Sequence, residues 1–158
     1  MLNRKSISIE PIHGNEYETP QELFNKLNDE FNFIHDVACN KSNIKCGTGF
    51  TYPEYDSLKC DWPLDGWLWL NPPYKPLRPW IEKTQEQVKR GCKVVMLIPP
   101  VTIACKYFSN LKPKEMRFLK GRVKFLIEGE PMHSNTRDSV IYIYDGDPEF
   151  SIARWIEK

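Results

Sequence analysis

The sequence predicts one three-layer α/β domain, and three features support that prediction. Residues 94–98 form an apolar run without alternation, which is typical of a central strand covered on both faces. Amphipathic patterns before and between the candidate strands predict helices that cover those faces. Further strand patterns follow residue 115, so helices are mixed with a buried parallel-type strand and late β-rich structure, as in layered α/β folds.

The first helix is predicted to follow an N-terminal arm, residues 1–18, that carries no clear periodicity. Thr19 as N-cap, Pro20 at the first helical position and Glu22 three residues after the cap mark its start as a capping box. Apolar residues at four-residue spacing continue to Phe31, which gives an amphipathic helix of about three turns.

Two short strands are predicted next, over residues 33–38 and 67–70, with a loop and one helical turn over residues 39–61. The first strand is expected to end near Asp36. Ligands of α/β sheets gather at the carboxyl ends of strands. Asp36 and the residues that follow Leu70 are therefore expected to lie at one ligand site.

The second half of the chain is predicted to contain both helices and strands. A helical face over residues 80–88 ends at Gly91, a residue suited to the position just past a helix C-terminus. The strand over residues 94–98 ends at Pro99, and a short helix is predicted over residues 103–111. Three strands are predicted to close the chain, over residues 116–119, 122–127 and 140–144.

Length and composition indicate a globular chain with a single domain over residues 19–158 and no separate target-recognition domain. The 158 residues are 41% hydrophobic and 13% aromatic, which excludes a disordered chain. No apolar run approaches the roughly 20 residues of a membrane span, and no apolar segment of a secretory signal follows Met1.

The five cysteines form no C-x-x-C pair, which argues against a disulfide framework or a zinc site and favours reduced thiols in a cytoplasm. A metal shared by Cys39 and Cys46 is the weaker alternative, because the histidines lie far away in sequence.

Charge is segregated along the chain although the net charge is only +1. Residues 54–65 hold four acids against one base, whereas residues 106–124 hold seven bases against one acid. The basic segment is expected to contact a polyanion, with an ordinary solvated surface as the alternative. Its candidate phosphate-binding residues are Lys106, Lys112, Lys114, Lys120, Arg122 and Lys124.

The most informative motif is Asn71-Pro72-Pro73-Tyr74, directly after the apolar run that ends at Leu70. Two adjacent prolines fix φ twice and remove two backbone donors, and the residue before a proline is held extended. A stiff loop therefore holds one amide side chain, main-chain carbonyls and one aromatic ring in fixed relation. Such a loop suits a planar amine that is gripped and then alkylated. The alternative is a proline-rich turn that ends a strand.

Further blocks lie in order between residues 19 and 142, and each alone is a weak signal. They are Thr19-Pro20-Gln21-Glu22-Leu23-Phe24, Glu30-Phe31-Asn32-Phe33, Asp36-Val37-Ala38-Cys39, Asn43-Ile44-Lys45-Cys46, Asp56-Ser57-Leu58 with Asp61-Trp62, Trp69-Leu70 before the proline motif, Trp80-Ile81-Glu82-Lys83, Val95-Met96-Leu97-Ile98-Pro99, Gly121-Arg122-Val123-Lys124-Phe125 and Val140-Ile141-Tyr142. Together they resemble the small phage and prophage DNA N6-adenine methyltransferases, often called phage-type Dam.

The resemblance implies a compact Rossmann-like methyltransferase domain in the cytoplasm of a bacterial or phage-infected cell. Its methyl donor would be S-adenosyl-L-methionine, and its acceptor would be an adenine amino group in double-stranded DNA. By the same resemblance, Asn71 and the carbonyl of Pro72 would accept hydrogen bonds from that amine, in the rigid loop that Pro73 completes. Tyr74 would stack on the base after it has left the duplex.

The resemblance also assigns residues to the methyl donor. Thr19 and Pro20 would lie beside its methionine end, while Asp36, in one block with Ala38, would face its amino group or ribose. Asp56-Ser57-Leu58 matches the block whose acid bonds the donor's adenine amine. Each has a plainer alternative, namely a helix cap, a solvated loop aspartate and a turn aspartate.

The chain departs from methyltransferases at two places. No Gly-x-Gly follows Asp36, a lack that the small phage family shares and that does not exclude donor binding. Residues 106–109 lack the tryptophan and histidine that relatives tend to have there. Base recognition is expected from loops 101–115 and 128–138, where Asn135, Arg137 and Asp138 could reach bases, while His133 is expected to be a loop residue.

Two other functions therefore stay open. One is a non-catalytic protein that keeps the fold and binds DNA or a host protein. The other is an enzyme whose acceptor is cytosine N4 or a protein glutamine amide.

Overall fold

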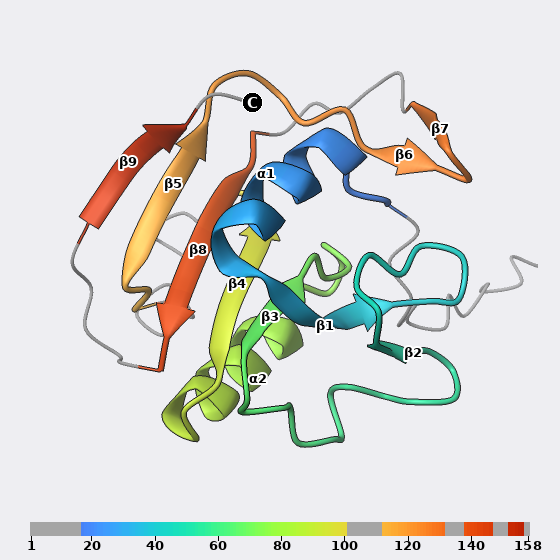
Figure 1. The fold of residues 1–158 in the computed structure, drawn as a ribbon, viewed down its shortest axis with the longest axis vertical. Coiled ribbons are helices and arrows are strands. Elements are labelled where there is room, and N and C mark those ends of the chain that lie inside the picture. Colours follow the sequence, from blue (N-terminus) through green and yellow to red (C-terminus); the bar gives the residue numbers. More distant parts are fainter. Residues whose placement is uncertain (1–16, 101–111, 132–137, 147–151, 157–158) are drawn as a thin grey trace, which may run out of the picture.

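A seven-stranded sheet forms the middle layer of the molecule (Figure 1). The computed structural model describes residues 17–100, 112–131, 138–146 and 152–156. The strand order is β2-β1-β3-β4-β8-β5-β9, and only β8 runs antiparallel to its neighbours in this sheet. The strands are β1 (Phe33–Cys39), β2 (Gly49–Thr51), β3 (Trp67–Leu70), β4 (Lys93–Ile98), β5 (Glu115–Leu119), β8 (Val140–Asp145) and β9 (Ile152–Ile156).

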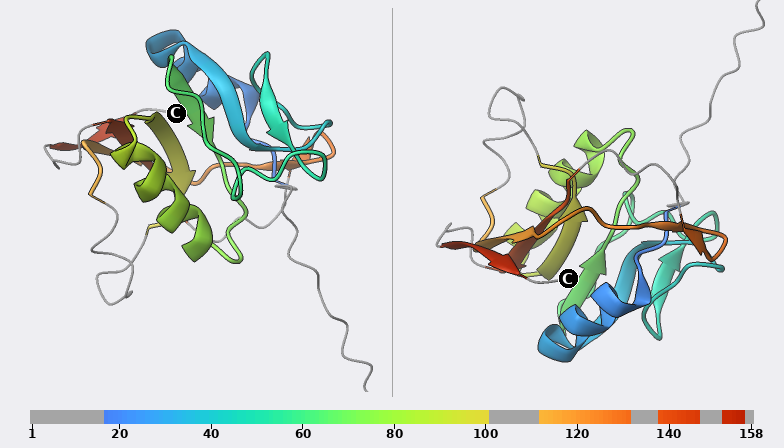
Figure 2. Two further views of the ribbon diagram at one scale, coloured as in Figure 1. Left: turned by 90° about the horizontal axis from the view of Figure 1, so that it is seen from below. Right: turned by 90° about the horizontal axis from the view of Figure 1, so that it is seen from above.

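Two helices cover opposite faces of this sheet, which confirms the three-layer prediction (Figures 1 and 2). Helix α1 (Gln21–Phe31) buries Leu23 and Leu27 in one core, together with Trp69 of β3. Helix α2 (Arg78–Lys89) buries Ile81 in the other core, against Leu68 and other residues of the sheet. Each helix buries an apolar stripe at the spacing expected of an amphipathic helix.

The predicted capping box at the start of α1 is wrong. The N-cap is Pro20 and no side chain caps the helix; the carbonyl of Pro20 accepts the first helical hydrogen bond, from the Phe24 N–H at 3.1 Å. Thr19 lies one residue too early to cap, and it is buried with a different hydrogen-bond partner, Asn71. The helix therefore starts one residue later than predicted.

The long α2 and the central strands follow the predictions closely. Helix α2 ends before Gly91, whose φ of +103° suits glycine at this position. Strands β3, β4, β5 and β8 lie within one residue of their predicted bounds. Strand β4 is buried on both faces from residue 94 onward, because helices lie on both sides of it.

The predicted strand over residues 122–127 is largely wrong. Only Leu126–Ile127 (β6) is a strand, and it pairs with Glu130–Pro131 (β7) in a separate two-stranded sheet. Both sides of β5 are already paired, one with β8 and one with β9, so the segment that follows β5 cannot pair with it. The predicted alternation is nevertheless present in part, because Val123 and Phe125 are buried while Lys124 is exposed.

Strand β1 continues three residues beyond Asp36, and strands β2 and β9 were not predicted. The predicted helix over residues 103–111 lies outside the described residues. No described helix has the length and apolar character that crossing a bilayer requires.

Candidate active site

A pocket lies at the carboxyl ends of β1 and β3. From β1 the chain runs to β2 on one side of it and then to β3 on the other, so the order of the sheet reverses between β1 and β3. Such a reversal point is where open α/β sheets bind their ligands. The pocket is lined by Tyr17, Glu18, Thr19, Asp36, Ala38, Asn43, Lys45, Trp69 and Asn71.

Asp36 supplies a buried carboxylate to this pocket. Its Oδ1 accepts a hydrogen bond from the Ala38 N–H at 3.3 Å, and its Oδ2 accepts one from the Lys45 N–H at 3.0 Å. Burial raises the pKa of Asp36 to about 7, although these two N–H groups act in the opposite direction. A ligand that donates a hydrogen bond or brings a positive charge would therefore stabilise the ionised form.

A polar turn takes the place of the missing glycine motif after β1. The Asn40 Oδ1 accepts from the Ser42 N–H at 2.8 Å, and the Asn43 Oδ1 accepts from the Asn40 N–H at 2.8 Å. These side-chain bonds fold the chain back, so that Asn43 and Lys45 reach the pocket wall. Asn43 and Lys45 were not predicted to belong to the site, and the asparagine pair at positions 40 and 43 is the signal in the sequence that indicates the turn.

The close backbone approach that a glycine permits is found at Gly49 in β2. A Cβ there would lie 2.6 Å from the Cys39 Sγ and 2.9 Å from the Asp36 carbonyl oxygen. Glycine therefore lets β2 pack directly behind Asp36.

Asn71 lies at the end of β3, where the strand meets the proline loop. Its Nδ2 donates to the main-chain oxygen of Tyr17 at 3.0 Å and to the Thr19 Oγ1 at 3.1 Å. The side chain is almost fully buried, with 4% of its surface exposed. Residues Tyr17 to Thr19 thus belong to the site, and Thr19 reaches it through Asn71 as well as through the pocket wall.

Tyr74 is packed among aromatic rings. Its ring centroid lies 6.5 Å from that of Tyr17 and 5.9 Å from that of Phe125. Burial raises the pKa of Tyr74 well above its usual range, and the Ser139 side chain offsets only part of that rise. Tyr74 is therefore a neutral ring held in a set orientation beside the buried Pro72 and Pro73.

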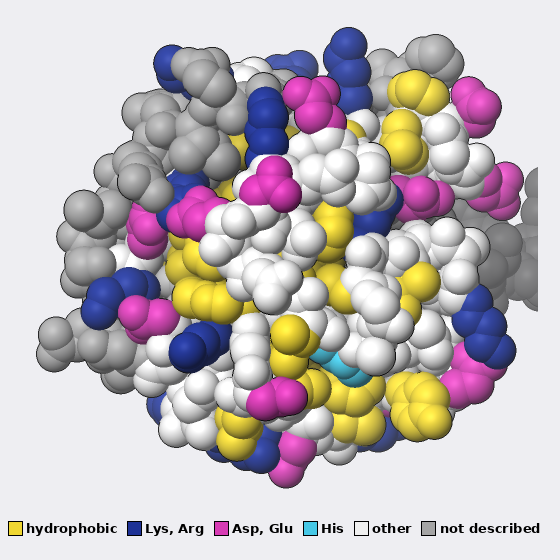
Figure 3. Space-filling model, viewed as in Figure 1, with side chains coloured by type: hydrophobic (Ala, Val, Ile, Leu, Met, Phe, Trp, Pro, Cys, Tyr) yellow, Lys and Arg dark blue, Asp and Glu magenta, His cyan; other side chains and the backbone are white. Residues whose placement is uncertain are grey.

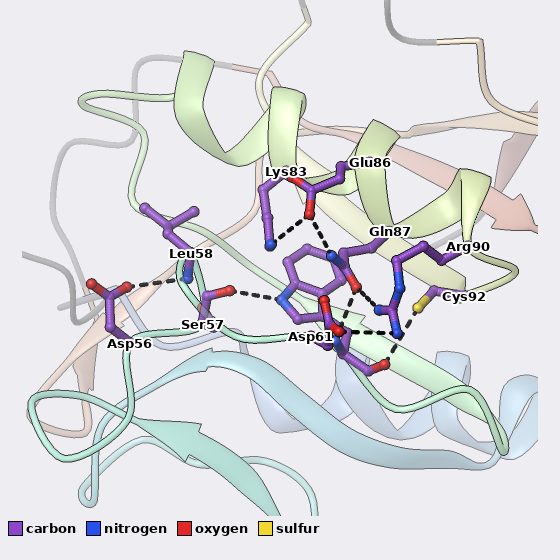
Figure 4. Close-up of polar contacts among 10 residues, drawn as sticks. Asp56, Ser57, Leu58, Asp61, Lys83, Glu86, Gln87, Arg90 and Cys92 are labelled. Carbon is purple, nitrogen blue, oxygen red and sulfur yellow. Dashed lines mark hydrogen bonds and ion pairs between the residues drawn. The ribbon is translucent and has the colours of Figure 1, made fainter.

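The segment Asp56-Ser57-Leu58 does not line the pocket, and neither does Pro20. The segment of residues 56–58 lies beside α2 (Figure 4), where the carbonyl of Ser57 accepts a hydrogen bond from the Trp62 Nε1 at 2.9 Å. The Trp62 N–H in turn donates to the Gln87 Oε1 of α2 at 2.9 Å. The Asp56 carboxylate bonds the Leu58 N–H at 3.1 Å, as a turn aspartate does.

The candidate phosphate-binding residues lie at opposite ends of strand β5. One group lies at the end of the sheet that holds the pocket, and the other group lies at the far end. Lys120, Arg122 and Lys124 are exposed and follow β5 at its carboxyl end, on the edge where the pocket lies. Lys112 and Lys114 precede β5 and so lie at the other edge, where the Lys114 Nζ is 3.8 Å from the Asp145 Oδ2. Lys106, Asn135 and Arg137 lie outside the described residues, as do His133 and residues 106–109.

The basic segment is also less exposed than its composition indicates. Arg117 is buried and forms ion pairs with Glu30 and Glu115. The Arg122 Nε lies 3.9 Å from the Asp138 Oδ1. On the face drawn in Figure 3, Lys and Arg side chains are scattered among Asp and Glu and form no continuous patch.

Within the described ranges, no group of three or more His, Cys, Asp or Glu side chains is placed to hold a metal ion. Comparison with protein families gives a match over residues 9–154 to the family described as DNA N-6-adenine-methyltransferase (Dam). The α/β fold is consistent with a methyltransferase-like domain. Comparison with curated proteins gives no match.

Proposed function

The chain belongs to the DNA N-6-adenine-methyltransferase (Dam) family, and we propose that its site transfers a methyl group from S-adenosyl-L-methionine to adenine N6 in double-stranded DNA. The observation that supports this most directly is the position of Asn71. Its amide lies on the wall of the pocket, at the strand end that carries the proline loop. The proposed donor pocket and the proposed acceptor loop would therefore be adjacent.

The pocket residues fit S-adenosylmethionine by their chemistry. This donor carries an ammonium, a carboxylate, ribose hydroxyls and a sulfonium with an electrophilic methyl group. The residues that line the pocket include two acids, Glu18 and Asp36, and one base, Lys45. Asp36 would hold the ammonium or a ribose hydroxyl, because its desolvated carboxylate gains most from such a partner. Lys45 would hold the carboxylate.

On the acceptor side, the amide oxygen of Asn71 would accept a hydrogen bond from the exocyclic amine of adenine. The carbonyl of Pro72 would accept a second one. Two acceptors turn the nitrogen toward the pocket and favour its tetrahedral, more nucleophilic form. The nitrogen would displace the methyl group from the sulfonium, with S-adenosylhomocysteine as the leaving group. The methylated nitrogen would then lose its proton to water, so no general base is needed. Rate enhancement would come from positioning and from preorganised dipoles.

The adenine must leave the duplex to reach this loop, and Tyr74 would stack on it. Base flipping costs a few kcal/mol, and stacking on an aromatic side chain returns about 1–3 kcal/mol. The packing of Tyr74 against Tyr17 and Phe125 holds its ring in one orientation. Stacking could therefore offset much of the cost of flipping without first ordering the ring.

DNA phosphates would be contacted by the segment of residues 120–125. This segment leaves β5 at the pocket edge and runs toward β6 (Figure 1). Its exposed Lys120, Arg122 and Lys124 are the described cations of the basic run that lie at this edge. Their contacts would position the duplex over the proline loop but would not read its sequence.

Transfer of tritiated methyl groups from S-adenosylmethionine to duplex DNA tests this function. We expect counts above background for the wild type and for Asn25→Ala, a change on the exposed side of α1. Asn71→Ala should give background counts. Equal counts from Asn71→Ala and Asn25→Ala would refute the role of Asn71, and background counts from all three proteins would refute the activity.

A further inference from the structure

We propose that Thr19 and the main-chain carbonyl of Tyr17 are positioning groups that fix which way the Asn71 amide faces. This makes the site specific for asparagine over aspartate at position 71. The kinetic consequence rests on the proposed function, whereas the orientation itself does not.

The orientation follows from the chemistry of the two acceptors. A main-chain carbonyl has no proton to donate, so the atom of Asn71 that lies 3.0 Å from the Tyr17 oxygen must be the NH₂ nitrogen. The second proton of that group then points to the Thr19 Oγ1 at 3.1 Å. The amide oxygen is turned to the opposite side. It is an atom that only accepts, and an exocyclic amine is a donor.

Both acceptors are themselves held in place. Between them lies Glu18, whose N–H donates to the Leu126 oxygen at 2.8 Å and whose oxygen accepts from the Leu126 N–H at 3.0 Å. The Tyr17 ring packs against Phe125, with centroids 6.4 Å apart. On the other side of Thr19, the carbonyl of Pro20 is fixed by the first turn of α1. The short bridge to Leu126 thus supports the orientation of Asn71.

Aspartate has the same shape as asparagine but cannot satisfy this arrangement. One of its oxygens would lie about where Nδ2 lies, 3.0 Å from the Tyr17 oxygen, and two acceptors at that distance repel each other. The Thr19 hydroxyl could turn to donate, but the Tyr17 carbonyl has no such freedom. Asn71→Asp should therefore lose the orientation although its size is unchanged.

Thr19→Val removes one of the two acceptors, the Thr19 hydroxyl, while keeping the shape of the side chain. Thr19→Ser keeps a hydroxyl at this position. We expect kcat to fall about 10- to 100-fold in Thr19→Val, since small errors of position cost this much. The KM for DNA should change much less. Thr19→Ser should restore most of kcat. The matched control is Thr84→Val, which removes a buried hydroxyl bonded to the Trp80 oxygen in α2.

A readout without activity separates this proposal from the proposed function. In ¹⁵N NMR spectra, the Asn71 side-chain NH₂ signals are identified by their absence in Asn71→Ala. We expect them to exchange with water more slowly than those of the exposed Asn25 in the wild type and in Thr19→Ser. Exchange should be faster in Thr19→Val and unchanged in Thr84→Val.

The proposal is overturned if the Asn71 protons exchange as fast as those of Asn25 in the wild type, or if Thr19→Val leaves their exchange unchanged. It is also overturned if Asn71→Asp retains the wild-type kcat. Slow exchange in a protein that transfers no methyl group would refute the proposed function and leave the positioning role supported.

Discussion

Replacing Asp36 by asparagine should change how the stability of this protein depends on pH. The Asp36 pKa is raised by burial from 3.8 to about 7, so between these values the folded protein binds a proton that the unfolded chain has released. The free energy of unfolding of the wild type must therefore fall as pH rises through this window. The full effect of this rise in pKa is on the order of 4 kcal/mol.

Most of this effect lies between pH 5 and pH 8. For a group with these two pKa values, the contribution of Asp36 to the free energy of unfolding is about 2–3 kcal/mol greater at pH 5 than at pH 8. Asparagine does not titrate, so Asp36→Asn should lack this part of the dependence. It should also carry a pH-independent cost, because an amide cannot accept well from both the Lys45 and the Ala38 N–H groups.

The assay is urea denaturation of both proteins at pH 5 and pH 8. The quantity compared is the change in the free energy of unfolding between the two pH values, so that the constant cost and the other titrating groups cancel. We expect the wild type to lose about 2–3 kcal/mol more than Asp36→Asn. Equal losses in the two proteins would refute the desolvated state of this carboxylate.

The remaining predictions concern the donor, the DNA and the core. At pH 6 the Asp36 carboxyl is largely protonated, so binding of S-adenosylmethionine should release a proton in the wild type but not in Asp36→Asn. Calorimetry in buffers of different ionisation enthalpy measures this release, and equal release from the two proteins would contradict a contact with Asp36. Replacing Lys120, Arg122 and Lys124 together by alanine should reduce the magnitude of the slope of log DNA affinity against log salt concentration by about 2–3. Lys112→Ala should leave this slope unchanged. The reverse result would place the duplex at the amino end of β5. Arg117→Ala should lower the free energy of unfolding by about 3 kcal/mol in urea denaturation, because it removes a buried partner from Glu30 and Glu115; a loss below 1 kcal/mol would show that the ion pairs contribute little.

The parts of the fold that were predictable are those fixed by local pattern. Strands β3 and β4 are apolar runs that can only be buried, and α2 has a clear apolar stripe that ends at Gly91. Nothing outside these segments is needed to recognise them. Asp36 and Asn71 were expected near each other for the same reason, and they lie on neighbouring strands, Asp36 within β1 and Asn71 just past β3.

The parts that were missed depend on partners distant in sequence. Thr19 matches a helix cap locally, yet its hydroxyl bonds Asn71, 52 residues away. The segment after β5 has the alternation of a strand, but β9 already pairs with the side of β5 that this segment would need. Lys45 reaches the pocket only because an asparagine turn folds the chain back over Asp36.

The most direct test of the proposed activity is mass spectrometry of nucleosides from duplex DNA that was incubated with the protein and S-adenosylmethionine carrying a deuterated methyl group. We expect labelled N6-methyladenine with the wild type and none with Asn71→Ala. Label in N4-methylcytosine alone, or in no nucleoside while the donor binds one-to-one in calorimetry, would contradict adenine methylation by this site.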